Sequence, residues 1–386
     1  MSVSLFGTLP PLKAISVYCW WLSESLSRRQ PIEFFTFRKL YPEWLYPGGT
    51  KDRTPEWSVE PSPTLTIHRS LTYYNPLSWV WSALKARGRL IHAQWWSMPV
   101  GIVWFVVLGL LRLRGRRILL TVHNVEFHEK RWYDRLITKM VFSLADAFCV
   151  HCEANAQQLA DYMGIDRERI YVVPIPVYDQ YCQDGVSRET ARRRLGIEPD
   201  RVVFLLFGNH RDYKGTDVFL EATGALSEEQ RRKTAVLIVG QVWGDAAVYD
   251  RLIETHGLED VVHRYYEYVP MRDVQYYFQA ADVVVLPYKH FAAQSGVGSL
   301  ALAFGRPLLV TRVGGLPALT RRPEAVAEPD DVASLRDAVA RLLGNPELLE
   351  QMAADSRELA AERTWDRTAE RTLEVYRQVL DQKPAS

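Results

Sequence analysis

Short apolar runs alternate with longer amphipathic segments along the whole chain. Runs rich in Val, Ile and Leu predict buried strands and the segments between them predict helices, a rhythm typical of parallel α/β sheets. We expect strands at residues 3–6, 32–37, 64–68, 90–93, 118–123, 147–151 and 170–173, and then at 202–207, 235–239, 261–265, 283–287, 307–311 and 325–327.

Helical periodicity fills most of the intervals. Helices are expected at residues 15–27, 132–143, 153–163, 188–195, 217–225, 247–255, 271–280, 299–304 and 332–343. The tail at 346–380 is almost continuously helical and can kink near Trp365. The interval 41–63 is rich in Pro, Gly and charge, which predicts a long loop.

The α/β rhythm lapses once, at residues 174–199, where an interdomain linker is expected. A chain of 386 residues is too long for one ordinary core, so two domains fit it. Ligands of open α/β sheets bind at the carboxyl ends of the strands. Two such halves would leave a cleft suited to a transfer between two bulky molecules.

The charge and the apolar stretches of the sequence limit the kinds of molecule that the protein is expected to bind and where it is expected to be found. The net charge is +1, from 47 Lys and Arg against 46 Asp and Glu, so no global field favours nucleic acid and anion binding must be local. The N-terminus lacks the basic region of a signal peptide, and the longest apolar stretch, 98–111, is shorter than the roughly 20 residues of a spanning helix. We therefore expect a cytoplasmic protein.

A basic loop follows the first strand of the second half. Gly208 and Gly215 would let the backbone approach a ligand closely, while Arg211 and Lys214 are close enough in sequence to reach one phosphate. Asp217 is positioned to cap the next helix. The alternative is a solvated basic loop with a glycine turn.

A second loop, Gln294-Ser295-Gly296-Val297-Gly298, precedes a short helix. Small residues there would expose unpaired N–H groups at the positive end of the helix dipole, which is a ready anion site. Alone it could be an ordinary glycine-rich loop. Together with the basic loop it predicts a two-sided diphosphate clamp.

Several segments of the second half follow one another in a recognisable order. They are Phe207-Gly208, Arg211, Lys214-Gly215, Asp217, Tyr268-Val269-Pro270, residues 281–288, Gln294-Ser295-Gly296-Val297, residues 304–307 and residues 313–317. In this order and spacing, residues 204–317 resemble the donor domain of family 4 glycosyltransferases. The resemblance implies the GT-B fold, in which two Rossmann-like domains face each other across a cleft.

The resemblance also implies a division of labour. Residues 1–180 would bind the acceptor, residues 181–364 would bind a nucleotide sugar, and a C-terminal helix at about 365–386 would return to the first domain. The expected reaction is a retaining, metal-independent transfer of a hexose from a UDP- or GDP-sugar to a lipid-linked or saccharide acceptor. The donor-binding residues would be Gly7, Gly208, Arg211, Lys214, Val269, Gln294, Ser295, Gly296 and Val297.

A polar cluster follows one strand of the first half. The resemblance places His123 near the transferred sugar, with Glu126, His128 and Glu129 on the acceptor side. The alternative is that a histidine ending a strand merely bonds a neighbouring carbonyl. The cluster is not H-E-x-x-H, so metal-dependent hydrolysis is not expected.

One departure from the family is plain. Ala292 and Leu300 stand where family members often carry two glutamates, and Gln294 is a candidate replacement for the contact to the sugar. This departure motivates one rival function, a catalytically silent sugar-binding subunit. A second rival is a sugar-nucleotide epimerase, which can share this fold.

An apolar segment that ends in arginines runs from Val100 to Arg117. It could rest on an anionic membrane surface as a peripheral contact. A buried helix with a basic C-terminus that complements its dipole explains the same pattern.

Overall fold

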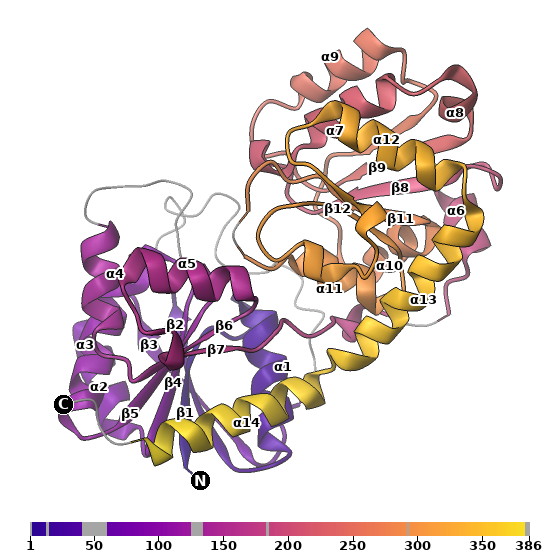
Figure 1. Cartoon of the computed structure of the whole chain (residues 1–386). Coiled ribbons are helices and arrows are strands. Elements are labelled where there is room, and N and C mark those ends of the chain that lie inside the picture. The colour runs from indigo at the N-terminus through magenta and orange to yellow at the C-terminus, as the bar shows by residue number, and fades with distance from the viewer. Residues whose placement is uncertain are drawn as a thin grey trace. The chain divides into compact units, whose positions relative to one another are not determined.

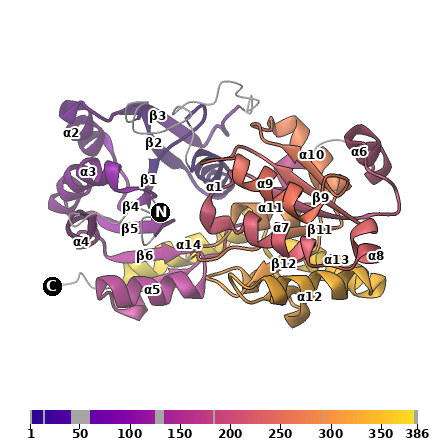
Figure 2. The ribbon, with the colours of Figure 1, turned by 90° about the horizontal axis from the view of Figure 1, so that it is seen from above.

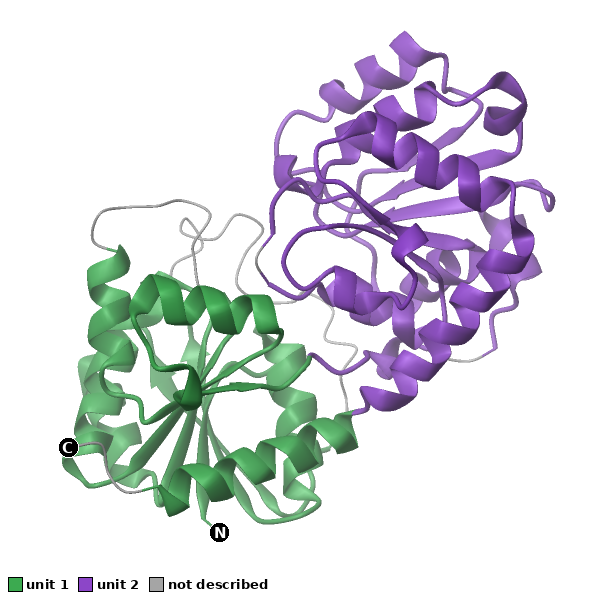
Figure 3. Ribbon diagram, in the orientation of Figure 1, with its two compact units in different colours: residues 1–174, 365–386 green, residues 175–364 purple. Residues whose placement is uncertain are grey.

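The computed structural model describes residues 2–12, 15–40, 60–124, 134–182, 185–291 and 293–382. The chain forms two compact units, one of residues 1–174 with 365–386 and the other of residues 175–364 (Figure 3). Each unit contains one sheet, and every strand pairing in both sheets is parallel. Both units therefore have the doubly wound α/β architecture that the apolar rhythm predicts.

The sheet of the first unit has the order β3-β2-β1-β4-β5-β6-β7. The strand order runs outward from β1 to β3 on one side and from β4 to β7 on the other. The carboxyl ends of β1 and β4 therefore flank a topological switch point. The strands are β1 (Val3–Gly7), β2 (Ile32–Lys39), β3 (Leu65–Thr72), β4 (Leu90–Trp95), β5 (Arg117–Val122), β6 (Ala147–Val150) and β7 (Ile170–Val172).

Helices cover both faces of this sheet. Figures 1 and 2 show α2, α3 and α4 along one face, with α1 and α14 on the other. The last helix, α14, packs on α1, which confirms that the C-terminal helix returns to the first domain. The helices are α1 (Ser16–Ser27), α2 (Pro76–Lys85), α3 (Gly101–Leu113), α4 (Asp134–Phe142), α5 (Glu153–Met163) and α14 (Trp365–Asp381), with 3-10 turns at Met98–Val100 and Arg167–Arg169.

The sheet of the second unit has the order β10-β9-β8-β11-β12-β13, with its switch point between β8 and β11. Its strands are almost wholly apolar because side chains of both faces are buried. The strands are β8 (Val202–Phe207), β9 (Thr234–Val239), β10 (Val262–Tyr265), β11 (Val283–Leu286), β12 (Leu308–Thr311) and β13 (Val326–Ala327).

Two hydrophobic layers cover the second sheet. Alternate residues of β8 separate between them: Phe204 and Leu206 belong to the layer under α7, α9 and α12, and Val203 and Leu205 to the layer under α6, α10 and α11. The helices are α6 (Arg188–Leu195), α7 (Thr216–Gly224), α8 (Glu228–Arg232), α9 (Ala247–His256), α10 (Met271–Ala280), α11 (Gly296–Ala303), α12 (Val332–Leu343) and α13 (Pro346–Glu362), with 3-10 turns at Asp179–Tyr181, Asp212–Lys214, Pro317–Leu319 and Pro323–Ala325.

The C-terminal tail breaks where the sequence indicates. Helix α13 ends at Glu362 and α14 begins at Trp365, so the expected kink is a change of helix. Across the described residues, no helix combines the length and the apolarity needed to span a membrane.

Candidate functional site

Two loops meet at the switch point of the second unit. One follows β8 and carries Gly208 and Lys214, and the other follows β11 and leads to Val297 on α11. A β-carbon built on Gly208 would lie 3.2 Å from Lys214 Nζ and 3.4 Å from Val297 Cγ2. The structure thus brings the basic loop and the start of α11 together at the edge where ligands of such sheets bind.

Lys214 lies at this junction as a partly dehydrated cation. Its Nζ donates a long hydrogen bond of 3.4 Å to the Phe207 carbonyl and lies 5.6 Å from the centre of the Tyr288 ring. Burial, reinforced by the Arg211 charge, lowers the pKa of Lys214 to about 8. No ion pair to Lys214 is found among the described residues. A cation held in this way favours an incoming anion.

Arg211 is oriented by an aromatic ring. Its guanidinium lies over Trp243, 3.9 Å from the ring centre, and Trp243 N donates to the His210 carbonyl at 2.8 Å. Stacking of this kind restricts a flexible side chain while leaving its N–H groups free at the edges. Sequence reasoning missed Trp243, because it follows β9 and lies far from Arg211 along the chain.

An ion-pair bridge connects the two loops. Lys289 Nζ contacts Asp217 at 2.7 Å and Asp212 at 3.0 Å. The expected capping role of Asp217 is wrong, because α7 begins at Thr216 with Gly215 as its N-cap, and the carboxylate pairs with Lys289. Lys289 was not predicted either, since only the fold places it beside Asp212.

The start of α11 has the features of an anion site. Ser295 Oγ accepts from Gly298 N at 3.3 Å and lies 3.2 Å from the Tyr288 hydroxyl, which fixes the first turn. The first amides of a helix have no intrahelical acceptor, so those of Gly296 and Val297 add to the positive end of the dipole. Small residues keep the approach to these amides open.

Gln294 has a structural contact as well. The residue is 6% exposed, and its Oε1 accepts from Ile175 N at 2.7 Å. The carboxamide oxygen therefore holds the chain where the second unit begins. Leu300 is buried in the core below α11, so the helix supplies no carboxylate at that position, while Ala292 lies outside the described residues.

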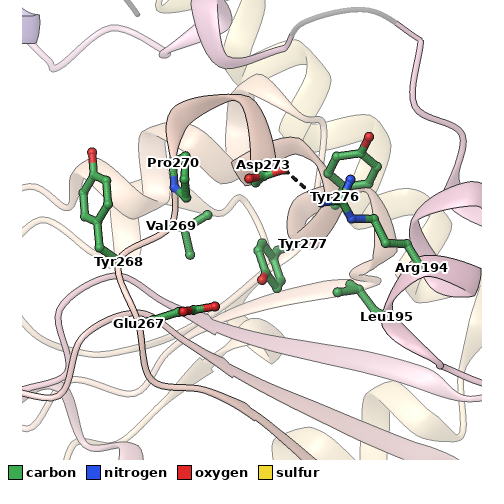
Figure 4. A pocket seen from close by; sticks show the side chains of 9 residues that line it. All are labelled: Arg194, Leu195, Glu267, Tyr268, Val269, Pro270, Asp273, Tyr276 and Tyr277. Atoms are coloured by element: carbon green, nitrogen blue, oxygen red, sulfur yellow. Dashed lines mark hydrogen bonds and ion pairs between the residues drawn. The ribbon is translucent and has the colours of Figure 1, made fainter. Parts of the chain in front are cut away.

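A small pocket lies beside Val269 (Figure 4). Its volume is about 140 Å³, well below the several hundred Å³ that enclose a whole organic ligand. The Arg194–Asp273 ion pair, 3.1 Å long, closes one side. The pocket can admit part of a ligand at most, and its lining residues are Arg194, Leu195, Glu267, Tyr268, Val269, Pro270, Asp273, Tyr276 and Tyr277.

In the first unit, His123 follows β5 and both of its ring nitrogens have partners. Nε2 lies 2.9 Å from Gln94 Oε1 and Nδ1 lies 3.0 Å from His151 Nε2. Gly7 packs nearby, since a β-carbon there would lie 3.1 Å from Gln94 Cγ. Sequence reasoning missed Gln94 and His151.

The other residues predicted for the first unit are not tested. Glu126, His128 and Glu129 lie outside the described residues. Within the described ranges, no three His, Cys, Asp or Glu side chains are grouped as metal ligands.

The arginines after α3 serve the fold. Arg112 and Arg117 contact Asp146 at 2.7 and 2.8 Å, and Arg114 donates to the carbonyls of Ala83 and Ala86. The helix is therefore buried on one side, and the contact with a membrane stays a prediction. Residues such as Val103, Val107 and Leu111 are buried, whereas Ile102 is 59% exposed. Helices α2 and α3 pack on each other, and their other exposed apolar residues are Leu77, Trp81, Leu84, Phe105 and Leu113.

Two sequence profiles match the chain. The profile described as "Glycosyl transferase 4-like domain" matches residues 13–176, and the one described as "Glycosyl transferases group 1" matches residues 187–359. Together they cover most of both units.

Several curated relatives carry the same description. The D-inositol 3-phosphate glycosyltransferase of Saccharomonospora viridis is 31% identical over 260 residues, which span 63% of this chain and 58% of the relative. The enzyme of that name from Acidothermus cellulolyticus is 28% identical over 390 residues, spanning 96% and 86%. For several such relatives the match spans less than two thirds of their length.

Solved structures show the same fold. Sucrose-phosphate synthase from Thermosynechococcus elongatus has a TM-score of 0.75 at 19% identity, covering 98% of this chain and 99% of that one. Anabaena HepE, solved with UDP and glucose, has a TM-score of 0.73 at 14% identity, covering 98% and 100%. At these sequence identities, the structural similarity shows only that the fold is shared.

Proposed function

Because the chain belongs to the family 4 glycosyltransferases and has the GT-B fold, we propose that it transfers a hexose from a nucleoside-diphosphate sugar to a saccharide or lipid-linked acceptor. The observation that carries this proposal is the junction of Lys214, Gly208 and Val297 at the switch point. An unpaired ammonium beside the first amides of a helix suits a diphosphate leaving group.

The proposed mechanism stabilises charge on that leaving group. Lys214 and the α11 amides would bind the diphosphate from two sides, and Arg211, held by Trp243, would bind it through its guanidinium edge. As the glycosidic C–O bond to the diphosphate breaks, negative charge grows on the phosphate oxygens that these donors contact. The acceptor hydroxyl would attack from the same face and pass its proton to a donor phosphate oxygen, which gives retention without a protein nucleophile.

The first unit would bind the acceptor in this scheme. His123, which follows β5, would lie against the transferred sugar. Glu126, His128 and Glu129 are the candidates for contacts to the acceptor. A product of inverted configuration would contradict the retaining mechanism, and one of these three residues would then be a candidate general base.

A UDP-sugar is the first donor to test, since the HepE structures contain UDP or UDP-glucose. We expect 1 mM UDP or GDP to raise the melting temperature of the second unit's transition by several degrees, because a ligand that binds only the folded state stabilises it by about 2.7 kcal/mol at 100 times its Kd. The same shift should persist in EDTA. Absence of a shift with every nucleoside diphosphate would contradict the proposal.

Product analysis separates the rival functions. A transferase forms a new glycoside with retained configuration only when an acceptor is present. An epimerase converts the nucleotide sugar without acceptor, and a silent subunit binds the nucleotide but leaves it unchanged. Buried Leu300 in place of a glutamate motivates the silent subunit, whereas the intact arrangement around Lys214 favours a working donor site.

We further propose that α2 and α3 contact an anionic membrane surface. Leu77 and Leu84 on α2 are 78% and 59% exposed, and Trp81 lies between them with Lys85 Nζ over its ring at 4.5 Å. Exposed Lys85 and Arg87 supply positive charge next to this apolar row. An exposed apolar row flanked by cations matches the acyl and headgroup layers of an anionic bilayer.

Vesicle flotation tests this contact. We expect the protein to float with vesicles containing phosphatidylglycerol, and replacing Leu77, Trp81 and Leu84 together by Ser should lower the bound fraction at least about tenfold, because burying each such side chain contributes about 1.5–3 kcal/mol. Val248→Ser, at an exposed apolar residue of α9, is the matched control. Equal flotation of the triple variant would refute the assignment.

A further inference from the structure

A row of polar side chains crosses the carboxyl ends of β4, β5 and β6. The Tyr376 hydroxyl on α14 lies 2.7 Å from His92 Nδ1. His92 Nε2 lies 2.6 Å from Thr121 Oγ1 and 3.2 Å from Gln94 Nε2. Gln94 Oε1 lies 2.9 Å from His123 Nε2, and His123 Nδ1 lies 3.0 Å from His151 Nε2. The row ends where His151 Nδ1 meets the Val173 carbonyl at 3.0 Å.

The carbonyl at the end of the row fixes the first proton. A backbone carbonyl only accepts, so His151 Nδ1 must carry hydrogen and donate it. Burial lowers the pKa of His151 to about 4, so the ring is neutral at pH 7 and its Nε2 is an acceptor. The partner of that nitrogen, His123 Nδ1, must then be the donor.

Gln94 decides the state of the other nitrogen of His123. With Oε1 toward His123 Nε2, Gln94 would need a second proton on the ring and therefore an imidazolium. After a half-turn of the carboxamide, its N–H donates to His123 Nε2 and its oxygen accepts from His92 Nε2. In this second arrangement Thr121 Oγ1 also accepts from His92 Nε2, and His92 Nδ1 accepts from the Tyr376 hydroxyl, so every ring nitrogen of the row has a matching partner.

The surroundings favour the neutral arrangement. Two aromatic side chains pack on the row, Tyr18 of α1, whose ring centre lies 5.0 Å from that of His123, and Tyr376 of α14; Trp365 packs on Tyr18 from behind. Burial lowers the pKa of His123 well below its usual range, and the neighbouring His151 and His92 lower it further. A cation there would have no counter-ion in the described part of the chain.

We propose that Gln94 and His151 are positioning residues that hold His123 as its Nδ1–H tautomer, with the ring fixed at the end of β5. This inference rests on the proposed function: the His123 ring would be a fixed, neutral surface against which the transferred sugar lies. The ring does not carry the acceptor's proton, because both nitrogens are engaged within the unit. Gly7 belongs to the same arrangement, since any side chain there would press on Gln94.

Nitrogen-15 NMR of the histidine-labelled full chain tests the tautomer directly. We expect His123 to show a protonated Nδ1 and an unprotonated Nε2, unchanged from pH 6 to pH 8. His151→Gln keeps an acceptor for Nδ1–H and should keep this signature, whereas His151→Leu should lose it. An Nε2–H tautomer or an imidazolium in the wild-type protein would overturn the proposal, whatever the protein's activity.

Kinetics test the link to the reaction separately. His151→Leu should lower kcat about tenfold or more, as loss of an orienting partner commonly does, with the donor KM within about twofold. His151→Gln should restore most of kcat, and neither variant should shift the pH–rate profile. If the tautomer is as expected but kcat is unchanged in His151→Leu, the positioning role fails while the donor site stands. Loss of nucleotide binding in the wild type would instead refute the proposed function.

Discussion

Replacing Lys214 by Met is expected to lower kcat/KM for the nucleotide sugar by about 10²–10³-fold, because it removes a charge-assisted donor aimed at the leaving diphosphate. The methionine keeps the apolar stem, so the loop should stay folded. Steady-state kinetics with the donor found by thermal shift would measure the effect.

The same variant should not lower stability. A lysine with a pKa near 8 in the folded chain and 10.5 in the unfolded chain is harder to protonate when folded. Its charge therefore opposes folding fully below pH 8, and this penalty disappears as the pH rises from 8 through 10.5. Lys214→Met should melt at the wild-type temperature or above it at pH 7.

The matched control is Lys233→Ala, at the exposed C-cap lysine of α8 that pairs with Glu229. It should leave both the rate and the melting temperature unchanged. In the wild type, donor affinity should fall as the pH rises above 8, and Lys214→Met should lose this dependence. If kcat/KM of the Lys214→Met enzyme lies within threefold of the wild-type value, the proposed electrostatic role of this lysine is refuted.

Replacing Gly215 by Ala is expected to cost about 3 kcal/mol of folding stability, since it combines an unfavourable backbone conformation with a clash. Gly215 has a φ of 66°, and a β-carbon there would lie 2.0 Å from the Pro287 carbonyl oxygen. Neither backbone segment can yield without moving Lys214 or the loop after β11. Melting temperature should fall by roughly 6–12 °C, with nucleotide binding weakened at least about tenfold.

Gly257→Ala provides the comparison. Gly257 caps α9 with a φ of 60°, but no atom lies within 4 Å of a β-carbon built there. It should cost only about 1 kcal/mol and leave nucleotide binding intact. Equal effects of the two substitutions would show that the contact with Pro287 is unimportant, and calorimetry alongside nucleotide titration would decide.

The elements of the fold could be predicted where their burial produces a simple pattern of apolar residues in the sequence. Strands such as β8 and β11 are covered on both faces, so they are continuous apolar runs, followed by Gly208 and Pro287 respectively. Helix α2 was missed although Asn75 caps it and Pro76 starts it, because exposed Leu77 and Trp81 obscure its polar face.

The candidate site could be predicted only where its parts are adjacent in sequence. Arg211 and Lys214 share one loop, so spacing alone brings them together. Trp243 and Lys289 reach the same site from the loops after β9 and β11. The strand order places them there, and it cannot be deduced from the spacing of residues along the chain. The row from Gln94 to His151 was missed for the same reason, since it joins the ends of three strands.

A crystal structure of the chain with UDP tests the central claim most directly. We expect the terminal phosphate within hydrogen-bond distance of Lys214 Nζ and of the Gly296 or Val297 amide, with the Arg211 guanidinium still stacked on Trp243. UDP bound with its diphosphate away from Lys214 and from the start of α11 would contradict the claim.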